Sequence, residues 1–312
     1  SVLWNKHNCC ILATMSVNYV SHKDIDQNRW DMAISKSANP KIYAESWYLN
    51  ITTNRQWDAL ISDDYTAVMP LPFNKKIFGI PQVYRPLFSQ QLGVFHQTRQ
   101  INVDEFVNCI PSKFKRLHYA FNNNNTVIGG EWKTNLILPL SATFDTIMSN
   151  FSSSLRKRLK RSSGLQLTET SNVEDIISLY KDQLESKVKL GDAGYAVATK
   201  LFAEATQRNN ADLYHLTDGD DIVAAGVFLK KYNRIINVFA TSINTKKHPN
   251  AMSVLLAKIM DKHSESDYVF DFEGSDLPGV KKYFASFGSI EENYPVLQYN
   301  KLPYLLKLIR PT

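Results

Sequence analysis

The residues best suited to chemistry are two carboxylates near the end of the chain, Asp271 and Glu273. They close a short apolar stretch, 268–272, which we predict to be a strand that a helical crossover places parallel to an earlier one. Side chains alternate across a strand, so both carboxylates point the same way if the strand continues that far. A carboxylate there could take a proton from an attacking amine. The alternative is a structural carboxylate that caps the next helix.

The strongest cluster of charge lies at 152–161, where three serines precede a run rich in arginine and lysine. On a helix, Phe151, Leu155 and Leu159 recur every four residues and form a docking side, with a serine as N-cap. The candidates for binding a phosphorylated substrate on the other side are Arg156, Lys157, Lys160 and Arg161. A solvated helix between two domains explains the same pattern.

Composition narrows the class of protein. Lysine and arginine number 36 against 30 acidic residues, and the surplus of +6 is too small to indicate a nucleic-acid binder by itself. Cys9, Cys10 and Cys109 form no metal-binding pattern, and their odd number argues against a disulfide framework, so we expect a reducing, cytoplasmic compartment. No apolar run approaches the roughly 18 residues of a membrane span. The histidines show no metal-ligand spacing, so no metal site is predicted.

The order of expected elements is similar in the two halves of the chain. The first half is expected to contain helices at 26–35 and 43–51, strands at 57–61, 65–71 and 76–88, a helix at 103–110, and strands at 116–121 and 136–140. The second is expected to contain a strand at 165–168, helices at 173–188 and 195–208, strands at 213–216, 222–229 and 235–241, a helix at 250–263, the strand at 268–272, a helix near Pro278 and a strand at 296–299. We therefore expect an α/β protein with mixed α+β sheets in two tandem units.

The expected domains are a leader at 1–14, a first unit at 15–150 and a second unit at 151–312. The division follows the repeated order of elements, since the two halves share negligible sequence identity. The oligomeric state cannot be read from these residues.

That order of elements resembles the GNAT acyltransferase fold. A tandem pair resembles the Fem-type peptidoglycan aminoacyl transferases and related GNAT-like proteins of bacteria. The most specific stretch comprises 270–275 (FDFEGS), 278–280 (PGV) and 283–288 (YFASFG). It is similar to a strand, a small-residue turn, a helix and an F-K-x-x-F-G pattern near the end of such proteins. The resemblance implies two GNAT-like units, of which the first is degenerate.

The resemblance also implies a donor, either acyl-CoA or aminoacyl-tRNA, and no covalently bound cofactor. In this fold the sheet splays apart after the fourth strand, where the donor's pantetheine pairs with exposed backbone. The pyrophosphate lies at the amino end of the next helix, where free N–H groups favour anions. The expected donor-binding residues at the matching corner are Lys246, Lys247, His248, Asn250 and Ala251. The acceptor would be a small-molecule amine or a cell-wall precursor.

Two features depart from the family pattern. The glycine-rich loop of acetyl-CoA enzymes is missing at 244–251, and the usual tyrosine and lysine near the final helix fall on Phe284 and Ala285. Further candidates for substrate binding are Ser275, Lys282 and Tyr294.

Three functions stay open on these residues. The first is an N-acyltransferase that works by direct attack of an amine, because no activated cysteine or serine is evident. The second is a non-catalytic protein of the same fold that binds a nucleotide-linked or polyanionic ligand through 155–161. The third is an RNA-binding module, which would bring exposed aromatic residues among the basic ones.

Overall fold

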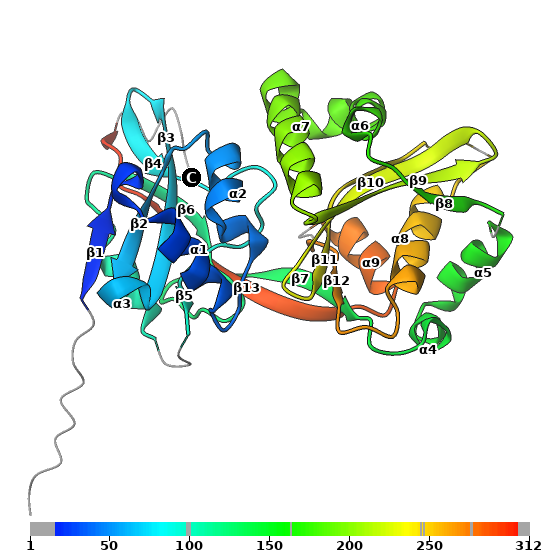
Figure 1. The fold of residues 1–312 in the computed structure, drawn as a ribbon, viewed down its shortest axis with the longest axis horizontal. Helices are drawn as coiled ribbons and strands as arrows, with labels where there is room; N and C mark the ends of the chain where they lie inside the picture. Colours follow the sequence, from blue (N-terminus) through cyan, green and yellow to red (C-terminus); the bar gives the residue numbers. More distant parts are fainter. Residues whose placement is uncertain are drawn as a thin grey trace, which may run out of the picture.

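The computed structural model describes residues 16–97, 101–162, 164–243, 245, 247–274 and 277–304. The leader predicted at 1–14 lies outside this part of the chain. Figure 1 shows two lobes side by side, which we call the first and second halves. They share one mixed sheet, with strands in the order β1-β2-β3-β4-β6-β13-β7-β12-β11-β10-β9-β8.

The first half holds the elements that precede residue 140, of which the last, β7, extends into the second half. They are β1 (Val17–Val20), α1 (Gln27–Ser35), α2 (Ser46–Thr52), β2 (Trp57–Ser62), β3 (Ala67–Ile77), β4 (Ile80–Val83), β5 (Phe95–His96), α3 (Val103–Asn108), β6 (Arg116–Ala120) and β7 (Glu131–Pro139).

The second half holds the remaining elements. They are α4 (Phe144–Ser149), α5 (Ser153–Arg161), β8 (Gln166–Glu169), α6 (Val173–Val188), α7 (Gly191–Gln207), β9 (Ala211–Asp218), β10 (Asp221–Lys231), β11 (Arg234–Ser242), α8 (Ala251–Lys262), β12 (Val269–Asp271), α9 (Pro278–Ala285) and β13 (Ile290–Asn300).

Helix starts follow the capping residues. The side chains of Asp26, Asn102, Ser152 and Asn172 accept backbone N–H groups at the starts of α1, α3, α5 and α6. Each occupies an N–H group that has no partner inside the helix. Pro278 begins α9, where its missing N–H costs nothing. The cap predicted in the serine run is confirmed.

The predicted strand at 76–88 is wrong. β3 turns back at Phe78 and Gly79, which have φ values of 46° and 75°, and pairs with the short antiparallel strand β4. A left-handed glycine favours such a tight turn. After Val83 the chain leaves the sheet, and 84–91 forms an irregular segment between the two halves.

Two strands join the halves. Residues 290–296 of β13 pair with β7, and 296–300 pair with β6. The other edge of β7 pairs with β12. Figure 1 shows β13 running from one lobe into the other. β7 precedes the predicted domain boundary at 150/151 in the sequence but lies among strands of the second half. The boundary therefore stays a prediction.

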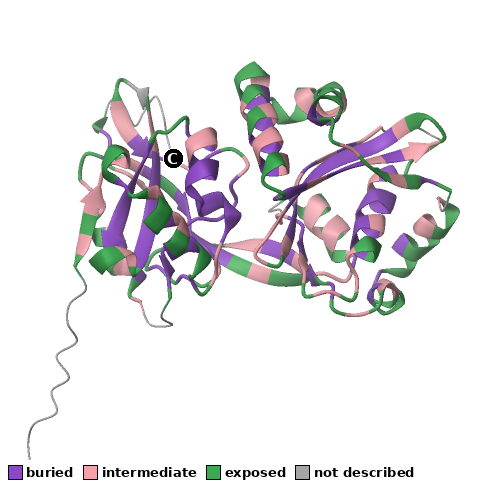
Figure 2. Cartoon of the chain, in the orientation of Figure 1, coloured by how far each residue is buried: buried purple, intermediate pink, exposed green. Residues whose placement is uncertain are grey.

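The core is also continuous between the halves. One apolar cluster contains Trp30 and Trp57 from the first half together with Phe202 and Phe239 from the second. A second cluster packs α4, α5 and α8 against the other face of the second half's sheet. Figure 2 shows the buried residues following the strands through both lobes. The two lobes therefore have a fixed relative position at the strands that connect them.

The second half's sheet opens beside β11. Parallel pairing of β11 with β12 covers only three positions and ends at Ile236 and Asp271. β11 continues to Ser242, and along 237–242 it has no strand partner on that side among the described residues. We call this stretch the β11 opening. The splayed sheet that the resemblance implied is therefore present in the second half.

Candidate functional site

A cavity of about 400 Å³ lies between the two halves, next to the end of β12. We call it the interhalf pocket. Its lining residues come from the irregular segment, β7, the turn after β12, and β13: Arg85, Pro86, Leu87, Phe88, Ser89, Gln90, Thr134, Glu273, Gly274 and Tyr294. Four stretches far apart in sequence thus build one site.

Both halves hold the irregular segment in place. The Tyr48 hydroxyl donates a hydrogen bond to the carbonyl of Phe88. The ring of Phe88 packs against Phe202 and Phe239, with centroids 5.5 and 6.0 Å apart. Phe239 belongs to the unpaired part of β11, so the interhalf pocket borders the β11 opening.

The turn after β12 directs Glu273 into the pocket. Glu273 and Gly274 have φ values of 56° and 47°. A Cβ atom on Gly274 would lie 2.4 Å from the carbonyl oxygen of Thr134. Only glycine therefore allows the turn to lie this close to β7.

Glu273 is a carboxyl group with an unusual environment. The Tyr43 hydroxyl donates a 2.5 Å hydrogen bond to its Oε1. Burial raises the pKa of Glu273 to about 8, and the charge of Asp271 adds to the increase, while Tyr43 and Arg85 oppose it. Such a group is mostly protonated at neutral pH and becomes a base slightly above it. A perturbed carboxyl in a pocket is a candidate for proton transfer.

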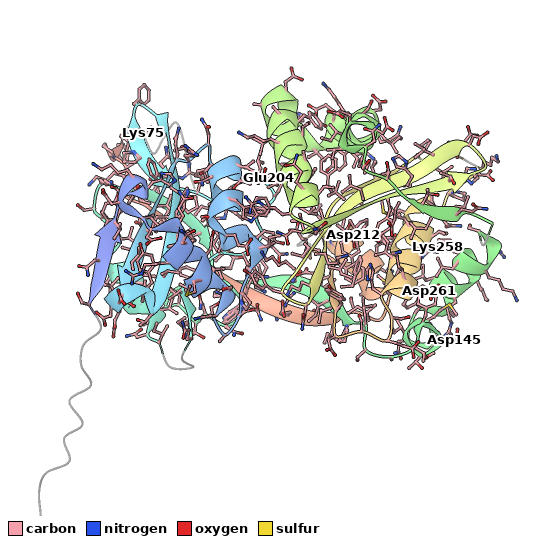
Figure 3. All side chains as sticks on the ribbon, viewed as in Figure 1. Lys75, Asp145, Glu204, Asp212, Lys258 and Asp261 are labelled. Carbon is pink, nitrogen blue, oxygen red and sulfur yellow. The ribbon has the colours of Figure 1, made fainter. Side chains whose placement is uncertain are left out.

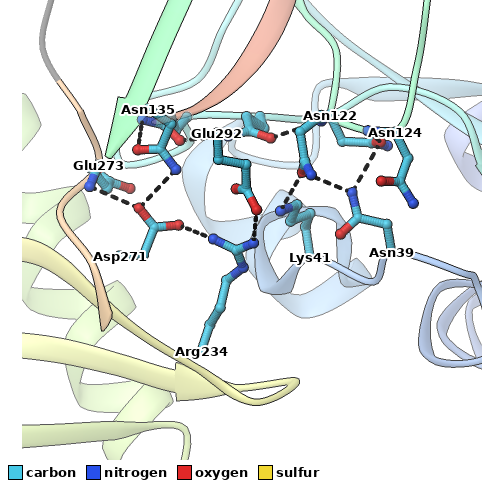
Figure 4. Close-up of polar contacts among 12 residues, drawn as sticks. Asn39, Lys41, Asn122, Asn124, Asn135, Arg234, Asp271, Glu273 and Glu292 are labelled. Atoms are coloured by element: carbon cyan, nitrogen blue, oxygen red, sulfur yellow. Dashed lines mark hydrogen bonds and ion pairs between the residues drawn. The ribbon is translucent and has the colours of Figure 1, made fainter. Parts of the chain in front are cut away.

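Asp271 has a different environment. It is buried, and its Oδ2 lies 2.6 Å from the guanidinium of Arg234. Its Oδ1 accepts hydrogen bonds from Asn135 at 3.0 Å and from the backbone N–H of Glu273 at 2.9 Å. Figure 4 shows these contacts with the second ion pair of Arg234, to Glu292 at 2.6 Å. Asp271 therefore orients the Glu273 turn.

Asp271 and Glu273 have different environments because β12 ends at Asp271. The alternation expected from a continuing strand does not apply to Glu273, whose backbone is left-handed. Both residues stay candidate site residues, with different environments.

The same polar network reaches Lys41 in the first half. Its Nζ donates a 3.0 Å hydrogen bond to Asn123. Burial, with the nearby charge of Arg234, lowers the pKa of Lys41 to about 8. Figure 4 places Lys41 between Glu292 and Asn122. The polar network therefore crosses from one half to the other.

The predicted donor corner lies before α8. Lys247 and His248 both approach Asp218 on the β9–β10 turn, at 2.7 and 3.3 Å. Asn250 precedes the helix without a capping bond from its side chain, and Ala251 is the buried first helical residue. Lys246 lies outside the described residues. The Ala251 N–H donates to the carbonyl of His248 at 3.3 Å, and no side-chain hydrogen bond from Asn250 caps the helix start.

The predicted basic cluster forms α5. Leu155 is fully buried, which confirms the docking side. The exposed basic residues of α5 are Arg156, Lys157, Lys160 and Arg161. Arg156 also donates a 2.6 Å hydrogen bond to the carbonyl of Ser149. α5 packs against α8 on the side of the second half that faces away from the first, where Figure 3 labels Lys258 and Asp261. The structure does not bring this cluster to the interhalf pocket.

The remaining candidate substrate-binding residues also lie at different places in the structure. Tyr294 lines the interhalf pocket. Lys282 is exposed on α9, and Ser275 lies outside the described residues. Phe284, at the usual tyrosine position, packs against Phe272. The neighbouring Tyr283 has its hydroxyl 3.1 Å from Ser253 on α8, and burial raises its pKa to about 12.

Sequence reasoning missed Tyr43 and Arg85. Tyr43 is 230 residues from its partner Glu273, and Arg85 lies in the segment that we predicted as a strand. Neither has a spacing that indicates a site. The Arg85-Pro86 step, which disfavours regular structure before a proline, was the one local signal.

Within the described part of the chain, no group of three or more His, Cys, Asp or Glu side chains could hold a metal ion. The helices described there are too short or too polar to cross a membrane.

Comparisons with known proteins show the fold. No family model matches the sequence, and no curated protein matches it. A crystal structure of FemX matches over 92% of this chain and 99% of that chain, with 11% identity and a TM-score of 0.61.

Two further structures are similar. The C-terminal domain of a putative lysylphosphatidylglycerol synthetase from Agrobacterium fabrum matches over 91% of this chain and 94% of that chain, with 13% identity and a TM-score of 0.56. L-PGS from Bacillus licheniformis matches over 91% and 96%, with 14% identity and a TM-score of 0.50. At these identities the similarity concerns the fold alone, and the chain has a tandem GNAT-like fold, as the resemblance predicted.

Proposed function

We propose that this protein is an acyltransferase that moves an acyl or aminoacyl group to an amine. The donor, an acyl-CoA or an aminoacyl-tRNA, lies along the β11 opening, and the amine enters the interhalf pocket. One observation carries the proposal: the half-buried carboxyl of Glu273, whose pKa is raised to about 8, lies in a pocket that borders strand backbone unpaired on one edge.

In the proposed transfer, the residues have the following roles. The amine nitrogen attacks the acyl carbon, and a C–N bond forms as the bond from that carbon to the donor's sulfur or oxygen breaks. Ionised Glu273 takes the proton from nitrogen, and the leaving sulfur or oxygen then receives it. Asp271 and Gly274 fix the turn that aims Glu273. Holding both reactants in one cleft supplies much of the rate enhancement.

The donor corner supports the same assignment. The start of α8 follows directly from β11, so a donor whose arm lies along 237–242 would bring its phosphates towards Lys247, His248 and Asn250. Helix N-termini favour anions. For this role Lys247 would exchange Asp218 for phosphate. The 15–150 and 151–312 units then differ in role, with the second providing the donor site.

The test is a transfer assay with a panel of acyl-CoA and aminoacyl-tRNA donors against simple amines. Transfer that depends on Glu273 is expected, with a rate that rises as pH increases through about 8 because the base is the ionised form. No transfer from any donor of either class would count against the proposal.

A second candidate function is supported by the exposed basic residues of α5. A protein of this fold could bind a nucleotide-linked or polyanionic ligand there without catalysis. Salt-sensitive binding that is lost on Lys157→Glu with Lys160→Glu and unaffected by Glu273→Gln would favour it.

A further inference from the structure

The interhalf pocket holds a cation and a titratable carboxyl group. Among its described lining residues, Arg85 and Glu273 are the charged ones. They are close enough for the charge of Arg85 to act on Glu273. A ligand that fills this pocket therefore meets a cation and a carboxyl group within one small volume.

The Arg85 side chain has no partner in the described part of the chain. Among the described residues its guanidinium makes no hydrogen bond and no ion pair, whereas Arg234 is paired with two carboxylates. Arg85 is exposed, but the chain around it is fixed. Tyr84 donates its backbone N–H to Pro72 at 3.1 Å, Pro86 is buried, and Tyr48 binds the carbonyl of Phe88.

Protein contacts occupy other polar side chains of the lining. The amide of Gln90 donates to Asn135 at 3.2 Å and accepts from Gln91 at 2.8 Å. The hydroxyl of Thr134 lies 3.4 Å from the Nζ atom of Lys281. Arg85 therefore has the largest unused donor capacity in the pocket, with five N–H groups in a planar fork.

We propose that the acceptor carries a carboxylate as well as its amine, and that Arg85 binds this carboxylate while the amine faces Glu273. The assignment of the amine rests on the proposed function. A guanidinium fork matches a carboxylate with two parallel hydrogen bonds. A cavity of about 400 Å³ lies at the small end of the range for ligand sites. The ligand class is thus an amino acid or the end of a short peptide.

The first test measures binding without any donor. L-Alanine, L-lysine and L-alanyl-L-alanine are titrated by calorimetry against their C-terminal amides. Each acid is expected to bind about 10-fold or more tightly than its amide, since losing one charged contact to Arg85 costs a factor of this order. The acid that binds most tightly distinguishes a free amino acid from a peptide.

The matched variants are Arg85→Gln and Arg29→Gln. The first should reduce the affinity for acids to that for amides and leave the amides within about twofold, because only the carboxylate contact is lost. Arg29 is also exposed, but it pairs with Asp64 on the first half's surface, so its variant controls for net charge. Arg85→Lys should recover part of the preference, because an ammonium keeps the charge without the fork.

Three results would overturn the inference: acids and amides of equal affinity, a preference that survives Arg85→Gln, or no binding of any acid at millimolar concentration. Inorganic phosphate that displaces the acids with equal affinity would also overturn it. If the protein transfers acyl groups equally well to amines with and without a carboxylate, the inference is wrong and the proposed function stands. If binding depends on the carboxylate but no donor supports transfer, the carboxylate site at Arg85 stands and the proposed function is wrong.

Discussion

The two halves differ at the same topological position. In the second half, β11 continues along 237–242 after its parallel pairing with β12 ends. In the first half, β4 ends where its pairing with β6 ends. The chain then returns, and Leu92 bridges Phe121 and donates its N–H to Ala120 at 2.8 Å. One order of elements therefore gives one open site and one that its own chain fills.

The residue two places after each crossover strand shows the same difference. After β12 it is Glu273, which lines the interhalf pocket. After β6 it is Asn122, which is buried and binds the carbonyl of Val94 and the amide of Asn39. An amide cannot act as a base at neutral pH, and this one holds the returning segment. The proposed function would therefore place the chemistry in the second half and a supporting role in the first.

The largest expected effect is on catalysis. Glu273→Gln keeps the shape and the Tyr43 contact but removes the base, so transfer should fall about 100- to 10,000-fold. Steady-state kinetics with a donor identified in the panel measures the loss. Glu174→Gln, an exposed change at the start of α6, is the control. Undiminished transfer by the Glu273 variant would remove the proposed proton acceptor.

The next effect is on stability. Arg234→Met leaves the buried Asp271 and the half-buried Glu292 without their cation, which should lower the free energy of unfolding by about 3–5 kcal/mol. Urea denaturation measures it. Arg29→Met breaks an exposed pair with Asp64 and should cost no more than about 1 kcal/mol. Equal losses from the two variants would show that the ion pairs of Arg234 are not what stabilises the β11 opening.

A smaller effect is expected at the filled position. Asn122→Ala removes the hydrogen bonds that hold the returning segment and should lower the free energy of unfolding by about 1–3 kcal/mol. Transfer at a temperature where the variant is folded should stay within about threefold of the original rate, since Asn122 does not line the interhalf pocket. A loss of transfer comparable to that of Glu273→Gln would contradict the division of roles between halves.

The last effect concerns the pH dependence of stability. Folding raises the pKa of Glu273 from 4.5 to about 8, so its stabilising contribution is complete below 4.5 and is lost as pH rises towards 8. Glu273→Gln removes this loss. Relative to the original protein, the variant should therefore gain stability between pH 5 and pH 8, measured by urea denaturation at both values. A constant difference across the two values would exclude a raised pKa.

Local sequence signals predicted much of the fold. The serine cap of α5 and the order of elements in the second half follow from short-range patterns, and α6 has the predicted bounds. Pattern also predicted the strand before Glu273. The error at 76–88 arose because an apolar run around Pro81 was read as one strand, although Phe78 and Gly79 make a turn within it.

The site itself could be predicted only in part. Glu273 and Tyr294, both candidates from the sequence, line the interhalf pocket, and both lie near a strand with a recognisable motif. Tyr43 and Arg85 were not, because a contact across 230 residues leaves no local pattern. The pairing of β7 with β12 was missed for the same reason. Tertiary contacts of this kind decide which carboxylate is paired and which one is left in a pocket.

Hydrogen exchange with and without donor tests the central claim most directly. Acetyl-CoA and aminoacyl-tRNA are added in separate experiments, and backbone exchange is followed by mass spectrometry in both halves. A donor should slow exchange along 237–242 of β11 and leave the segment around Leu92 unchanged, because the returning chain already occupies the equivalent position in the first half. Protection confined to the first half, or no protection at β11 from either donor, would contradict the account.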